Sequence, residues 1–88
     1  MAYVYSCPAP NMKATGERIK SLMHQHGLTP KMIARVMGFE HEVAVYNWLK
    51  GKSLPKIDNL VILSDLLETP MEKIVVVDHV SITIDEDR

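Results

Sequence analysis

The sequence has little of what marks several large classes of protein. Its 88 residues contain one cysteine, Cys7, which excludes an internal disulfide and a cysteine-rich zinc site. No apolar run approaches the roughly 20 residues that span a bilayer. Residues 1–10 carry no Lys or Arg, unlike the start of a secretory signal. We therefore expect a single small domain in the cytoplasm, without membrane association.

Charge is small in total and uneven along the chain. The formal net charge is −1, which by itself argues against binding to nucleic acid. Residues 13–56, however, contain eight Lys and Arg against three Asp and Glu, for a net charge of +5, whereas residues 57–88 contain two against eight, for −6. Such an asymmetry can mark a surface for a polyanion. The alternative is that the solvated faces of a small domain differ by chance.

Apolar residues make up 47% of the chain, as in ordinary globular domains, and most are spaced for helices. Asn11 and Thr29 are favourable N-cap residues, Pro30 suits a first helical position, and glycines follow the periodic segments. Gly16 lies inside the first predicted helix, where it costs about 1 kcal/mol relative to Ala, so we expect another helix to approach it closely. The predicted helices span about residues 12–26, 30–37, 41–50, 57–67 and 71–75.

The second and fourth predicted helices each have an apolar stripe that is expected to face the core. The second helix is only about two turns long, too short to be stable alone, so it must pack on its neighbours. The stripes consist of Ile33, Val36 and Met37 in the second helix and of Ile57, Leu60, Leu63 and Leu67 in the fourth.

The spacing of apolar residues changes to a period of two near the end of the chain. Val and Ile alternate there with polar residues, which predicts a short C-terminal β segment within Val75–Ile84. This segment either forms a hairpin around Asp78 and His79, pairs with another chain, or folds back on its own helices. The expected organisation is an extended lead-in, a helical domain, and the β segment with an acidic tail, over residues 1–11, 12–76 and 77–88 respectively.

Residues 30–50 have the form of two short helices joined by a tight turn, the helix-turn-helix arrangement. Ala34 is small enough for the two helices to cross closely, and Gly38 permits the turn between them. Val45 and Trp48 are placed to pack the second of these helices on the core. This part of the chain is the one expected to carry the function.

The chain resembles the phage-repressor and Cro-like, or Xre-like, family of helix-turn-helix regulators over roughly residues 12–76. This resemblance implies a mainly α fold, a five-helix repressor-like bundle that contains the helix-turn-helix, followed here by the short C-terminal β segment. It also implies a sequence-specific transcriptional regulator, not an enzyme, that binds double-stranded operator DNA with the helix of about residues 41–50 in the major groove. The matching stretches are Gly16-Glu-Arg-Ile-Lys20, Gly27-Leu-Thr, Ile33-Ala-Arg-Val-Met-Gly-Phe39, Ala44-Val-Tyr-Asn-Trp-Leu-Lys-Gly-Lys-Ser-Leu-Pro55, Ile57-Asp-Asn-Leu and Leu63-Ser-Asp-Leu-Leu67.

Carried over residue by residue, the resemblance implies two sets of contacts with DNA. Phosphate contacts generally come from Lys, Ser and helix N-termini and fix the register of a protein on DNA, whereas base contacts carry the sequence information. The implied base-reading residues are His41, Glu42, Val43, Tyr46 and Asn47. The implied phosphate-binding residues are Lys31, Lys50, Lys52, Ser53 and Lys56.

The chain departs from the family pattern at several of these contacts. Pro30 stands where the family often has a Gln that touches the DNA backbone, and the reading edge carries both Glu40 and Glu42. Glu can accept a hydrogen bond from cytosine and Asn can read adenine, but carboxylates near phosphates are repelled. The second hypothesis is therefore a helix-turn-helix scaffold that serves protein–protein interaction, either antitoxin-like or without DNA binding.

No catalytic, metal or cofactor site is expected from the sequence. His24 and His26 are two residues apart in a predicted helix and therefore do not face each other, and no Ser/His/Asp spacing or phosphate-binding glycine loop is present. Family members usually bind DNA as dimers, and a hydrophobic strand with an open edge needs a partner. We therefore expect a homodimer that forms through Val75–Ile84.

Overall fold

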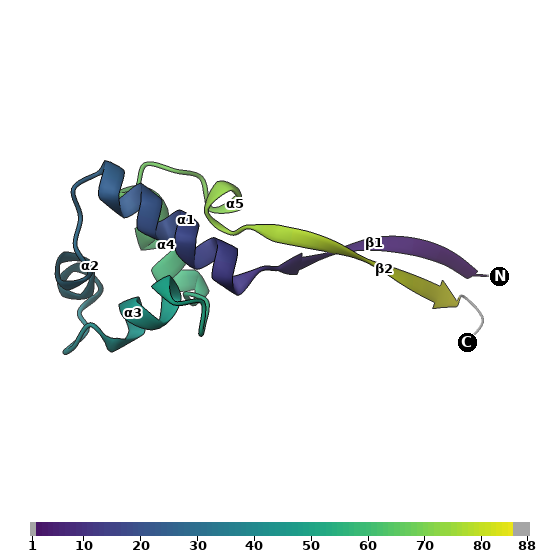
Figure 1. The fold of residues 1–88 in the computed structure, drawn as a ribbon, viewed down its shortest axis with the longest axis horizontal. Helices are drawn as coiled ribbons and strands as arrows, with labels where there is room; N and C mark the ends of the chain where they lie inside the picture. Colours follow the sequence, from purple (N-terminus) through teal and green to yellow (C-terminus); the bar gives the residue numbers. More distant parts are fainter. Residues whose placement is uncertain (1, 86–88) are drawn as a thin grey trace.

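The computed structural model describes residues 2–85 and places the helices in one body from which the two strands project as a long ribbon (Figure 1). The molecule measures 52 × 24 × 20 Å. The mainly α fold class is confirmed for this part of the chain. Its elements are β1 (Ala2–Pro10), α1 (Met12–Gln25), α2 (Pro30–Met37), α3 (Val43–Leu49), α4 (Ile57–Leu66), α5 (Met71–Ile74) and β2 (Val77–Asp85).

The first two helices begin where their capping residues predict. The Asn11 side chain accepts a hydrogen bond from the Ala14 N–H at 2.9 Å at the start of α1, and the Thr29 hydroxyl accepts one from the Met32 N–H at 3.2 Å at the start of α2. Each side chain thereby pairs a backbone N–H that the helix itself leaves free. Gly38, with φ of 78°, ends α2 in the left-handed conformation.

The other three helices lie close to their predicted ranges. The reading helix was predicted from about residue 41, but α3 begins at Val43, with Glu42 at its N-cap position and His41 in the preceding loop. The Glu42 side chain makes no capping hydrogen bond. Helices α4 and α5 each end one residue before the predicted position.

Gly16 marks the crossing of α1 and α3. A Cβ atom placed on Gly16 would lie 2.4 Å from the carbonyl oxygen of Trp48 and 2.8 Å from that of Leu49. Both distances are far below van der Waals contact, so only glycine permits the two backbones to approach this closely. The predicted close approach at this position is confirmed.

The hydrophobic core lies inside the helical body and includes every helix. Ala34, Val45 and Trp48 are buried, as predicted for the helix-turn-helix. The ring of Phe39 packs edge-on against Trp48 with centroids 6.0 Å apart. The buried apolar residues are Ile19, Met23, Ile33, Ala34, Val45, Trp48, Leu60, Leu63, Leu67 and Ile74.

Two residues assigned to the core stripes are instead exposed. Val36 is 54% exposed because it lies two residues from buried Ala34, which places it nearly on the opposite side of the helix. Ile57 is 73% exposed because it is the first residue of α4, one turn before Leu60, where burial begins. The spacing was correct in both helices, but the predicted stripe was wider than the surface that neighbouring helices cover.

The β segment pairs with the other end of the described chain. β1 runs antiparallel to β2 over its whole length, from Ala2 opposite Asp85 to Pro10 opposite Val77. A hairpin around Asp78 and His79 is therefore wrong, as is a strand folded onto the helices. The extended lead-in that the sequence predicted for residues 1–11 is largely this strand; Met1 and the predicted tail residues 86–88 lie outside the described residues.

Hydrogen bonds fix the base of the ribbon to α1. Thr15 is the polar side chain that is buried among residues 2–85, and its hydroxyl accepts from the Val76 N–H at 2.9 Å. The Asn11 N–H donates to the Val76 carbonyl at 2.8 Å, and the Asn11 side-chain amide donates to the Asp78 carboxylate at 3.1 Å. The ribbon therefore leaves the helical body in a defined direction.

Candidate nucleic-acid interface

Helix α3 packs one side on the core and turns the other to solvent. Val45 and Trp48 are buried, while Val43 is 65% exposed and Tyr46 is 46% exposed. Asn47 is half-buried. Of the five predicted base-reading residues, the remaining two, His41 and Glu42, lie just before the helix rather than on it. The exposed surface of α3 is thus short, apolar at Val43 and aromatic at Tyr46.

The loop from α3 to α4 folds back tightly on the end of α3. The backbone N–H groups of Lys52 and Ser53 both donate to the Asn47 carbonyl, at 2.9 and 3.4 Å. Gly51, with φ of 76°, lies so close to α1 that a Cβ placed on it would be 2.7 Å from the Cα of Lys13. Lys50, Lys52 and Lys56 are exposed along this loop, and Ser53 is half-buried.

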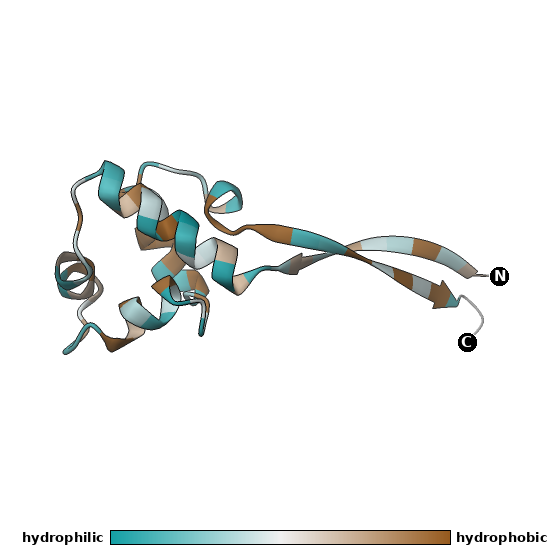
Figure 2. Ribbon diagram, in the orientation of Figure 1, coloured by the Kyte–Doolittle hydropathy of each residue, from teal (hydrophilic) through white to brown (hydrophobic). Residues whose placement is uncertain are grey.

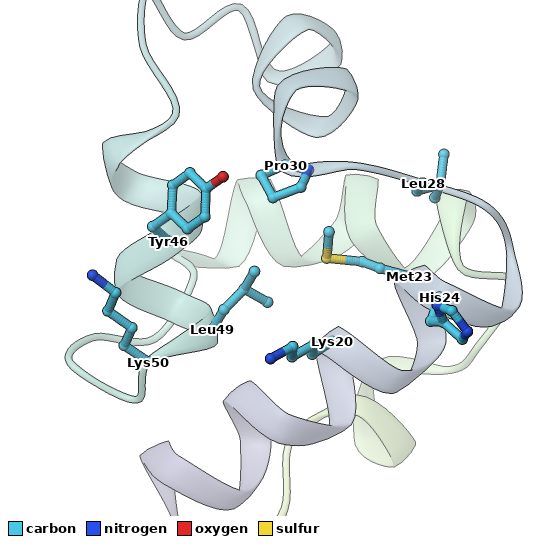
Figure 3. Close-up of a pocket in the computed structure, with 8 residues that line it drawn as sticks. All are labelled: Lys20, Met23, His24, Leu28, Pro30, Tyr46, Leu49 and Lys50. Carbon is cyan, nitrogen blue, oxygen red and sulfur yellow. The ribbon is translucent and has the colours of Figure 1, made fainter.

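Two lysines of α1 lie beside this loop and were missed by the sequence reasoning. Lys13 contacts Gly51, and Lys20 lines a hollow of about 420 Å³ together with Tyr46 and Lys50. In Figure 3 the Lys20 side chain extends toward α3, and the Tyr46 ring lies between α3 and Pro30 at the start of α2. The signal in the sequence was Gly16. Lys13 lies three residues before it and Lys20 four residues after it, so both share the helix face that crosses α3.

The carboxylates just before α3 share a surface with two cations. Lys31, Arg35, Glu40 and Glu42 line one hollow of about 290 Å³ at the turn between α2 and α3. The predicted phosphate-binding Lys31 therefore lies beside the acidic residues, whereas Lys50 lies beside Lys20, and Ser53 with Lys56 lines a third hollow. The predicted phosphate-binding residues are distributed around the helix-turn-helix rather than gathered at one point.

Family comparison agrees with this geometry. The family model described as Helix-turn-helix matches residues 19–74, more than half of the chain. The chain belongs to the Xre-like helix-turn-helix family. The matched stretch runs from Ile19 in α1 to Ile74 at the end of α5, so the helix-turn-helix of α2 and α3 lies within it and both strands of the ribbon lie outside it.

Solved structures share the helix-turn-helix fold at low sequence identity. The DNA-binding domain of BldD superposes with a TM-score of 0.61 at 18% identity over 75% of this chain and 94% of that one. The restriction-modification controller protein C.AhdI from Aeromonas hydrophila superposes with a TM-score of 0.62 at 19% identity, over 72% of this chain and 94% of that one. The S. venezulae BldD DNA-binding domain superposes with a TM-score of 0.61 at 18% identity, over 75% of this chain and 97% of that one. No curated protein matches the sequence.

Other kinds of site find no support in the part of the chain that the structure covers. Residues 2–85 contain no group of three or more His, Cys, Asp or Glu side chains close enough to hold a metal ion. No described helix has the length and apolar character needed to cross a membrane. The exposed surface of α3, with the lysines that lie beside it, is the candidate binding site of the helix-turn-helix domain.

Proposed function

We propose that the protein is a sequence-specific transcriptional regulator that binds double-stranded DNA with α3 in the major groove. The observation that carries this proposal is the exposed side of α3 with lysines from α1 and from the α3–α4 loop gathered beside its C-terminal end. The major groove admits one α-helix, and lysines beside an inserted helix can contact the phosphates that border the groove. Of the solved structures that share the fold, one is the DNA-binding domain of BldD and another is the restriction-modification controller protein C.AhdI.

Base reading in this proposal combines apolar and polar contacts. The Val43 side chain is the most exposed of α3 and suits the methyl group of thymine. Glu42 accepts from the amino group of cytosine, and Asn47 reads adenine from the half-buried side of the helix. His41 and Tyr46 complete the reading surface at its two ends.

Phosphate contacts in this proposal come from more elements than the sequence indicated. The predicted residues contribute from α2 and the α3–α4 loop, and α1 adds two lysines next to that loop. Each phosphate that a lysine neutralises releases counterions, so the affinity falls steeply with salt. The proposed phosphate-binding residues are Lys13, Lys20, Lys31, Lys50, Lys52, Ser53 and Lys56.

Two copies are proposed to bind one operator. A homodimer places two reading helices on successive turns of DNA, about 34 Å apart, and reads a two-fold symmetric site. The segment predicted for this contact, Val75–Ile84, overlaps β2, which projects away from the helical body (Figure 1).

The decisive test is a titration of the protein against its own upstream DNA and against random duplex at several salt concentrations. We expect tighter binding to the upstream DNA and a steep salt dependence. A Lys50→Glu, Lys52→Glu variant should bind about tenfold more weakly or worse and show a shallower salt slope. Lys73→Glu, a single charge reversal of the same kind in α5, is the control for each of the two changes and should change little.

Weak binding to both DNAs without a salt slope would contradict the proposal. It would favour the second candidate, a helix-turn-helix scaffold for protein–protein interaction. The observation behind that candidate is the position of Glu40 and Glu42 at the turn, beside Lys31 and Arg35, where two carboxylates weaken an approach to phosphates.

A further inference from the structure

The two faces of the ribbon differ in chemistry. In an antiparallel pair, directly opposite residues project from the same face, so the register divides the ribbon side chains into two sets. One set is almost entirely apolar and is called here the apolar ribbon face. It consists of the pairs Tyr3 with Ile84, Tyr5 with Ile82, Cys7 with Val80, and Ala9 with Asp78.

The opposite face is polar along most of its length. Its central pairs are Ser6 with Ser81, Val4 with Thr83, and Pro8 with His79. This difference is the pattern of a sheet with one buried and one solvated side. The partly buried residues of the two strands, Cys7, Ala9 and Ile84, all belong to the apolar ribbon face.

The helical body leaves the apolar ribbon face open. Tyr3 is 54% exposed, Tyr5 47%, Val80 52% and Ile82 42%. Figure 2 shows the strands with hydrophobic segments extending away from the helices. A two-stranded ribbon alone is marginally stable in water, and a contiguous exposed apolar surface marks an interaction site. The ribbon therefore needs a covering partner.

Charge identifies the kind of partner. Neither strand contains Lys or Arg, so the ribbon has no group that attracts phosphates of nucleic acids or lipid headgroups. On the apolar ribbon face the charged residue is Asp78, at the end near α1. The surface that fits is itself apolar and uncharged, and a second copy of this chain carries such a surface with the same length and shape.

The strand edges favour contact through the face. The Asn11 N–H donates to the Val76 carbonyl, and because alternate residues point their N–H groups at the partner strand, the odd-numbered residues of β1 face β2. Pro8 and Pro10 then lie on the outer edge, where they offer no N–H to an added strand. Edge-to-edge pairing along β1 is therefore interrupted, as in natural protected edges.

We propose that the apolar ribbon face packs against the same face of a second copy and forms a two-fold symmetric, four-stranded dimer core outside the helix-turn-helix domain. The contact is isologous, so each tyrosine and isoleucine of the face contributes to the interface once from each copy. The two ribbons stack about 10 Å apart, as packed sheets do. This assigns the dimer contact to both ends of the described chain, β1 as well as β2, and it goes beyond the proposed DNA contacts.

The first test compares neighbouring positions on the two faces by light scattering after size exclusion, in the absence of DNA. The wild-type protein should have the mass of a dimer. Ile82→Asp should raise the dissociation constant about tenfold or more, whereas Thr83→Asp, the same charge one residue along on the polar face, should leave the dimer intact. Circular dichroism of both variants should show the wild-type helical content, because the core lies in the helices.

The second test uses the natural thiol and does not depend on a disruptive variant. Cys7 is the one cysteine of the chain and lies on the apolar ribbon face near the middle of β1, so a short bismaleimide linker should join two copies covalently. Moving the thiol to the polar face, with Cys7→Ser and Ser6→Cys together, should abolish the cross-link at the same protein concentration.

A monomeric wild-type protein, an equal effect of Ile82→Asp and Thr83→Asp, or equal cross-linking from positions 6 and 7 would overturn the ribbon dimer. These outcomes are separable from failure of the proposed function, because they are measured without DNA. An intact ribbon dimer that shows no salt-dependent DNA binding would contradict only the DNA proposal.

Discussion

At the scale of single residues, glycine is used for two different reasons in this fold. Gly16 has no room for a side chain because the carbonyl oxygens of Trp48 and Leu49 lie against it. Gly27 has open space around it but adopts a φ of 66°, a conformation that side chains disfavour. A methyl group added at each position therefore tests packing in one case and backbone strain in the other.

We predict that Gly16→Ala lowers the free energy of unfolding by about 2–3 kcal/mol, since the methyl group forces α1 and α3 apart and outweighs the better helix propensity of Ala. Gly27→Ala should cost only about 1 kcal/mol, from strain alone. Urea unfolding followed by circular dichroism measures both. A Gly16→Ala protein as stable as wild type would show that the helices do not cross as closely as described.

At the scale of elements, the surface proposed for DNA binding depends on how α1 crosses α3. The crossing brings Lys20 to the hollow that Lys50 and Tyr46 also line (Figure 3). A cation contributed by α1 thereby joins cations that follow α3 in the sequence. The surface proposed for DNA is therefore a product of tertiary packing and not of one segment.

We predict that Lys20→Gln weakens DNA binding several-fold and reduces the slope of log affinity against log salt by about 0.9, the value for one lost phosphate contact. Lys73→Gln, on α5, should leave the slope unchanged. Titrations by fluorescence anisotropy at several salt concentrations separate the two. An unchanged slope in Lys20→Gln would place this lysine outside the DNA contact while leaving the role of α3 untested by that variant.

At the scale of the whole molecule, the buried core and the surface proposed for dimerisation lie in different parts. Among residues 2–85, the buried apolar residues all lie between Ile19 and Ile74, within the helical body. The ribbon contributes its exposed apolar face and is joined to the body by the hydrogen bonds of Asn11 and Thr15 with Val76. The helices should therefore fold without the strands.

We predict that a chain of residues 11–76 unfolds cooperatively with the helical content of the intact body and is monomeric, because it retains the core and the Thr15–Val76 contact but lacks both strands. Circular dichroism with thermal unfolding and light scattering test the two parts of this expectation. Loss of helical signal would mean that the ribbon is required for folding of the body.

The features predicted correctly from sequence were local ones. Asn11, Thr29 and Gly38 act within one turn of their own position, so residue type alone indicates the helix boundary. Gly16 predicted a close approach because its cost in a helix requires a compensating contact. The same reasoning failed for Val36 and Ile57, since apolar spacing shows which residues share a face but not how far neighbouring helices cover it.

The pairing of the strands and the full set of lysines depend on contacts between distant residues. Residues 2–10 begin with the β-favouring Tyr3, Val4 and Tyr5 but also contain two prolines, so their pairing becomes apparent only beside β2, more than 65 residues along the chain. Lys13 and Lys20 join the candidate site through the same kind of distant contact. The family resemblance could not supply the ribbon, because the family match ends before β2 and begins after β1.

The register of the ribbon also determines how the molecule responds to force. Ala2 and Asp85 lie opposite each other at the far tip. Tension applied between them therefore loads the inter-strand hydrogen bonds one after another, starting at the tip. The strands should peel apart at low force before any load reaches the bonds between Asn11, Thr15 and Val76. Under tension the ribbon should therefore unfold first, at a force that leaves the helical body folded.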